Sequence, residues 1–165
     1  MVLNDGLFRN RQGIVDKRKA EGFANILAVE LTKSCAAITE GIAKSKFSRS
    51  KSEVAAGTIN MGREADLNEI ANAVQKANEE LERLPYLSAK NYPDTKLVEA
   101  MEKFRKYAVE QNEVFYTALL NNPDKYPSPQ SALKLYGSFV DALAEELKKM
   151  IGLDFGRVIM KGVGT

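Results

Sequence analysis

The fold of this chain is organised around the stretch from Asp16 to Ser45, DKRKAEGFANILAVELTKSCAAITEGIAKS. Six apolar residues recur along it at steps of four, four, four, three and four: Phe23, Leu27, Leu31, Cys35, Ile38 and Ile42. This spacing places all six on one side of a helix with about 3.6 residues per turn. Charged residues such as Glu30 and Lys33 fall off the stripe, so we expect them to face water. The stretch predicts an amphipathic helix about 45 Å long, whose apolar face needs partners.

The second amphipathic segment is predicted to begin at Ser50, because Ser50 and Glu53 match a capping box. We expect it to end before Pro85, since the residue before a proline disfavours helical geometry. The third segment is predicted to follow Asp94. Its apolar positions recur at steps of three and four, and we assign to its stripe Leu97, Met101, Phe104, Ala108, Gln111, Phe115 and Leu119.

The fourth segment is predicted to begin at Ser128, an N-cap residue, with Pro129 at the first helical position. We expect its inward face to carry Leu133, Tyr136, Val140, Leu143 and Leu147. Four segments with three connectors predict an all-α antiparallel four-helix bundle. The whole chain, 1–165, forms one domain in this prediction, with an irregular N-terminal arm at 1–15, the helical bundle at 16–152 and a tail at 153–165. The alternative is a second segment that breaks near Gly62 and gives five helices.

Length and composition agree with one globular core. The chain has 165 residues, of which 44% are hydrophobic and 28% are charged, as in ordinary globular domains. Its apolar runs are too short to cross a bilayer, and residues 1–15 lack the apolar run of a signal peptide. We therefore expect no membrane span and a cytoplasmic location. The single cysteine, Cys35, agrees with a reducing compartment and is predicted to be a buried small hydrophobic residue.

The chain contains no histidine, so it lacks the commonest metal ligand and the side chain that titrates most readily near neutral pH. Zinc, haem and Ser-His-Asp chemistry are disfavoured, and the Glu-x-x-His pattern of di-iron bundles cannot be formed. Glu110 and Glu113 are interpreted as part of a solvated face. We expect no catalytic residues, metal or cofactor. The prediction is a non-enzymatic interaction or adaptor module, a subunit or binding partner in a macromolecular assembly.

The first third of the chain is basic, with ten Lys and Arg against five Asp and Glu between Met1 and Lys51. In an up-down bundle the first and third connectors lie at the same end. We call this end the basic end, and its predicted anion- or partner-binding residues are Lys44, Lys46, Phe47, Arg49, Lys51, Lys125 and Tyr126. The second and fourth helices begin there, and their free N–H groups add positive potential. We predict that the basic end binds nucleic-acid phosphates or an acidic protein patch.

A protein is the first predicted partner, and two alternatives stay open. One is a nucleic-acid-binding helical subunit that uses the basic end. The other is a small-ligand-binding bundle, because the third segment has a wide apolar stripe. Tyr86, Tyr92 and Tyr126 lie beside prolines in the connectors; we expect them to pack against the bundle ends, with a partner-binding hot spot as the alternative.

Overall fold

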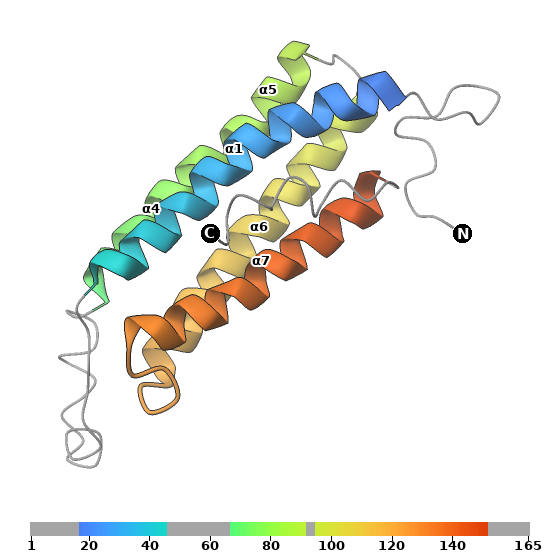
Figure 1. Cartoon of the computed structure of the whole chain (residues 1–165). Helices are drawn as coiled ribbons and strands as arrows, with labels where there is room; N and C mark the ends of the chain where they lie inside the picture. Colours follow the sequence, from blue (N-terminus) through green and yellow to red (C-terminus); the bar gives the residue numbers. More distant parts are fainter. Residues whose placement is uncertain (1–16, 46–66, 92–94, 152–165) are drawn as a thin grey trace.

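The computed structural model describes residues 17–45, 67–91 and 95–151, and within these ranges the chain is helical apart from short turns and caps. The helices, labelled as in Figure 1, are α1 (Lys17–Lys44), α4 (Asn68–Leu81), α5 (Arg83–Asn91), α6 (Thr95–Asn121) and α7 (Pro129–Ile151). No strand occurs in the described ranges. The prediction of an all-α bundle is confirmed.

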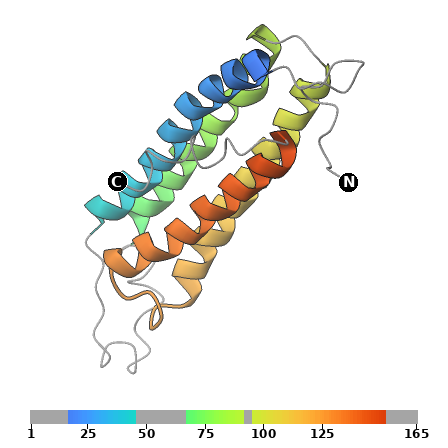
Figure 2. The same cartoon turned by 45° about the vertical axis from the view of Figure 1, so that its right-hand side comes forward.

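The helices pack as four rods, with α4 and α5 in line along α1 and with α6 beside α7 (Figures 1 and 2). Two contacts give the directions of α1 and α4. Gly41 lies against Ala73, whereas the Ser34 hydroxyl donates a hydrogen bond to the Ala77 carbonyl at 3.2 Å. Residues earlier in α1 therefore contact residues later in α4, so these two helices run in opposite directions.

The predicted stripe of α1 lies in the core, and each of its six residues is at most 1% exposed. The other helices add Leu67, Ile70, Leu81, Leu97, Met101, Phe104, Leu119, Leu143 and Leu147 to the same cluster. Burial of one such side chain contributes about 1.5 to 3 kcal/mol. The fold is thus held by the stripes that the sequence displays, with Cys35 among them as expected.

Helices α1 and α4 approach closely along a line of small residues, Ser34 and Gly41 on α1 and Ala73 and Ala77 on α4, which we call the α1/α4 seam. A Cβ atom placed on Gly41 would lie only 2.3 Å from the Ala73 Cβ. Glycine is required here because any side chain would push the two helices apart.

Aromatic side chains fill the contact between α6 and α7. The Phe115 ring centroid lies 5.1 Å from that of Tyr136 and 5.8 Å from that of Phe139, in tilted and edge-to-face arrangements that suit aromatic pairs. The Tyr136 hydroxyl meets the Cys35 thiol of α1, although the pair falls short of hydrogen-bond geometry. Burial raises the pKa of Cys35 to about 11, and burial raises the pKa of Tyr136 well above its ordinary value.

The prediction that the second rod ends before Pro85 is wrong, because α5 contains this proline and continues to Asn91. Pro85 is the third residue of α5, a position whose N–H needs no partner within the helix. The backbone at Glu82 stays in the right-handed helical region, with φ −62° and ψ −20°. The rod is therefore interrupted at Glu82 and resumes. Gly62, where the alternative prediction placed a break, lies outside the described residues, as do Ser50, Glu53 and Asp94.

Glu30 is buried, at 5% exposure, so the prediction that it faces water is wrong. It lies one turn before Ser34 on the face of α1 that meets α4, and α1 also contacts α7. A helix with neighbours on two sides has a wider buried arc than its apolar stripe. Lys33 Nζ lies 3.5 Å from Glu30 Oε1, whereas Oε2 has no hydrogen-bond partner within the described part of the chain.

Two assignments of inward positions also change. On α6, Asn112 rather than Gln111 is buried, and its side-chain amide donates a hydrogen bond to Asn78 Oδ1 of α4 at 2.8 Å. On α7, Leu133 is exposed, and Ala132 is buried instead. The remaining predicted inward residues of α6 are buried, as are Tyr136, Leu143 and Leu147 of α7.

Candidate functional site

Three of the seven residues predicted for the basic end can be located. Lys44 ends α1, and Lys125 and Tyr126 lie in the connector between α6 and α7, at the same end of the bundle in both ribbon views (Figures 1 and 2). Lys46, Phe47, Arg49 and Lys51 lie outside the described residues. Anion binding by this end stays a prediction.

The charge of Lys44 is already partnered. Its Nζ lies 2.8 Å from Glu40 Oε1, one turn earlier on α1, and this hydrogen-bonded pair raises the pKa of Lys44 and lowers that of Glu40. Glu69, in the first turn of α4, adds a further negative charge that acts on Lys44. An anion at Lys44 would therefore have to compete with two carboxylates.

The N-terminus of α7 offers fewer N–H groups than the prediction assumed. Pro129 has none, and the N–H of Ser131 points at Ser128 Oγ at 3.4 Å, while Ser131 Oγ accepts from the Ser128 N–H at 3.2 Å. This reciprocal arrangement is a capping box with serine at both positions. The predicted N-cap and first residue of α7 are confirmed, and the same cap uses a donor that an anion would need.

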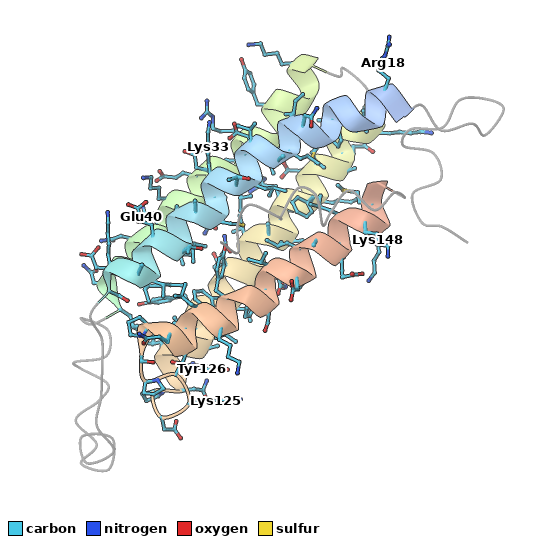
Figure 3. The ribbon with its side chains drawn as sticks, viewed as in Figure 1. Arg18, Lys33, Glu40, Lys125, Tyr126 and Lys148 are labelled. Atoms are coloured by element: carbon cyan, nitrogen blue, oxygen red, sulfur yellow. The ribbon has the colours of Figure 1, made fainter. Side chains whose placement is uncertain are left out.

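The connector tyrosines separate into different environments. Tyr126 is partly buried against the core, as expected, and Lys125 Nζ lies 5.8 Å from its ring centroid (Figure 3), within the range of a cation–π contact. Tyr86 lies on α5 and is 66% exposed, so the expectation that it packs against a bundle end is wrong. The rod continues past Pro85 and carries Tyr86 on its outer surface. Tyr92 lies outside the described residues.

A groove of about 450 Å³ runs between α4 and α6, and we call it the α4/α6 groove. Apolar atoms dominate its surface, with Ala71 and Val74 contributed by α4 and Tyr116 by α6. Gln75 and Asn78 also line it, and the Asn78–Asn112 hydrogen bond joins the two helices beside it. The groove has the volume of a typical binding site, although it is wide open to solvent.

Three carboxylates border the α4/α6 groove: Glu79 of α4, Glu82 at the C-cap of α4 and Glu113 of α6. All three are exposed, and none forms an ion pair with another described residue. The negative charge of Glu82 acts on Arg105 of α6, but the Arg105 guanidinium is hydrogen-bonded to Glu102 in its own helix. The described lining of the groove thus carries three negative charges and no positive one.

This groove was not among the features predicted from the sequence. Gln75, Glu79 and Glu82 recur at steps of four and three, so they share one face of a helix, and that polar stripe was visible in the sequence. Glu113 was interpreted as solvated, which is correct for its exposure. What the sequence could not give is the distance between α4 and α6, which decides whether the two faces close or leave a groove.

The described residues contain no group of three His, Cys, Asp or Glu side chains arranged to hold a metal ion. None of the described helices combines the length and the apolar character that a membrane-spanning segment requires. Comparisons with protein-family models, curated proteins and solved structures find no match to this chain. The surfaces of the protein itself are therefore the guide to its function.

Proposed function

We propose that this protein is a non-enzymatic interaction module whose protein partner binds in the α4/α6 groove. The observation that carries the proposal is the groove itself, in which apolar side chains lie between carboxylates that form no ion pair with a described residue. An apolar surface framed by unpaired charges has the composition of a protein-binding surface, in which burial of apolar area stabilises the complex and charge selects the partner.

The α4/α6 groove is favoured over the basic end because the described cations of the basic end already have partners. Lys44 is paired with Glu40, and Lys125 lies over the Tyr126 ring. The open shape of the groove favours a macromolecule over a small ligand, because small-molecule sites usually enclose most of the ligand surface. A cytoplasmic location remains part of the proposal, supported by the single cysteine, which is free and buried.

Recovery of a partner from an extract of the source cells tests this proposal. Gln75→Arg places a long cation in the groove, whereas Asn72→Arg makes a similar change at an exposed position of α4 that does not line the groove. We expect the parent protein and Asn72→Arg to retain the same partner and Gln75→Arg to lose it. Retention of the same proteins by all three would contradict binding in the groove.

The nucleic-acid alternative has its own test at the basic end. Replacement of Lys46, Arg49 and Lys51 by glutamine removes three charges from the predicted first connector, outside the apolar stripes, so we expect the melting temperature to be almost unchanged. If the basic end binds phosphates, the parent protein is retained on immobilised nucleic acid in a salt-dependent way and the variant is not. On our proposal neither protein is retained at moderate salt.

A further inference from the structure

We infer that the occupant of the α4/α6 groove is a basic amphipathic helix of the partner protein, one that presents Lys or Arg on both sides of an apolar face. This inference rests on the proposed function and adds the chemistry and conformation of the partner. Three properties of the groove carry it: the charge of its border, the apolar character of its floor and the helical form of both walls.

The charge of the border requires a cationic occupant. Glu79, Glu82 and Glu113 come from both walls, and Arg105 is engaged by Glu102. An anionic segment would meet three carboxylates, whereas Lys or Arg side chains would form ion pairs with them. Each exposed pair contributes at most about 1 kcal/mol, so the charges mainly select the partner and speed its encounter.

The floor requires an apolar strip between those cations. Val74 is almost fully covered by the core, so it closes the floor, while the partly exposed Ala71 and Tyr116 provide apolar surface above it. A purely polar cationic chain would leave this surface in water. Burial of apolar area contributes about 25 cal/mol per Å², which favours an occupant with an apolar face.

The walls favour a helical occupant. Backbone N–H and C=O groups in α4 and α6 are used within the helices, so the groove offers no strand edge for a peptide to extend. Two neighbouring helices instead form a trough that receives the side-chain ridges of a third helix. From Ala71 to Glu82 the groove is about 17 Å long, which matches about three turns of a bound helix.

Three synthetic peptides of about 14 residues test the inference on the full-length protein. The first is an amphipathic helix of leucine and lysine; the second has glutamate in place of each lysine; the third keeps the lysines but has serine in place of each leucine. Fluorescence anisotropy measures the affinity of each peptide, and amide chemical shifts locate the bound peptide. We expect the leucine-lysine peptide to bind best, at least tenfold more tightly than the other two, and to shift Asn78 and Glu113.

The matched protein variants remove three charges each. Glu79→Gln, Glu82→Gln and Glu113→Gln together should weaken binding of the leucine-lysine peptide at least tenfold and flatten its salt dependence. Glu99→Gln, Glu110→Gln and Glu145→Gln change net charge equally at exposed positions outside the groove, and should bind as the parent does. All six positions are exposed, so we expect both variants to remain folded.

Several outcomes would overturn the inference: equal binding by the two triple variants, equal binding of the lysine-serine peptide, or chemical shifts confined to another face. These results are separate from a failure of the proposed function. If Gln75→Arg still abolishes recovery of the cellular partner, the groove binds a protein of other chemistry. If the leucine-lysine peptide binds the groove but no cellular partner depends on Gln75, the surface has the inferred chemistry and the proposed function is wrong.

Discussion

Helix α4 meets its two neighbours in opposite ways. Toward α1 it presents Ala73 and Ala77, and the α1/α4 seam closes so tightly that Gly41 has no room for a Cβ atom. Toward α6 it presents the longer Gln75, Asn78 and Glu79, and a groove of about 450 Å³ remains. The size of the side chains between two helices thus decides whether the helices pack closely or leave a groove in which another molecule can bind.

A charge introduced into the buried core is expected to have the greatest effect on stability. Leu31 is fully buried on α1, so Leu31→Asp places an unpaired carboxylate among apolar residues, at a cost of several kcal/mol. We expect urea unfolding, monitored by circular dichroism, to lose its cooperativity. Val29→Asp is the control, since Val29 is 54% exposed two residues away and the change should have little effect. Similar unfolding curves for the two variants would contradict the assignment of the core.

The buried thiol of Cys35 should also make stability sensitive to alkaline pH. The pKa of Cys35 is raised from 9.0 to about 11, so the unfolded chain loses this proton first and the folded state is destabilised as pH rises between these values. The stability that Cys35 adds over Cys35→Ala is present in full below about pH 9. It should fall by about 2 to 3 kcal/mol by about pH 11. A constant difference in urea midpoints across this range would show that the thiol is not held in a buried site.

A smaller effect is expected where the α1/α4 seam is tightest. Gly41→Ala gains about 1 kcal/mol of helix propensity, but its Cβ would lie 2.3 Å from the Ala73 Cβ. The two helices must separate, and overpacking of this kind costs about 1 to 3 kcal/mol. We expect a net loss of stability, measured by thermal unfolding.

Gly137→Ala is the matched control for Gly41→Ala. Gly137 lies within α7, and apart from its chain neighbours and the nearby backbone of α7 itself, no atom lies within 4 Å of a Cβ placed on it. Helix propensity alone should act, which predicts a gain of about 0.5 to 1 kcal/mol. A gain of stability in both variants would mean that α1 and α4 pack less closely at Gly41 than described.

The smallest expected effect tests the polar contact beside the groove. Asn78→Ala, Asn112→Ala and the double variant form a cycle that isolates the hydrogen bond between the two side chains, 2.8 Å long. A neutral hydrogen bond contributes about 1 kcal/mol, so we expect a coupling of that size from urea unfolding. If the stability losses of the two single variants add up to that of the double variant, the hydrogen bond contributes nothing to stability.

The sequence predicts the helices and their buried stripes well and the α4/α6 groove poorly. The α1 stripe, the start of α7 and the buried Cys35 follow from periodicity and capping, which are local properties. Asn112 is buried in place of Gln111 partly for a local reason: four residues after Ala108 complete about 400° of rotation, closer to a full turn than three residues do. The other reason is Asn78, a partner on another helix that no local pattern reveals.

Glu30 and Pro85 show the same limit of local reasoning. Glu30 is charged, but it is buried because α1 has neighbours on two sides. Pro85 forbids a helix interior, but the chain begins a new helix two residues before it and keeps the same direction. The α4/α6 groove depends on the separation of two helices, which stripes on either helix alone do not specify.

The hydrogen bond between Asn78 and Asn112 also sets the register of α6 against α4. A slide of one helix along the other by one turn, about 5.4 Å, would separate the two amides and leave the largely buried Asn112 without this partner. Leucine at both positions would pack equally well in several alignments, whereas paired amides favour one. Glu79 lies on α4 and Glu113 on α6, so the spacing of these two carboxylates depends on this alignment. This interhelical hydrogen bond therefore helps to hold the pattern of negative charge that a partner would meet, together with the core that α4 and α6 share.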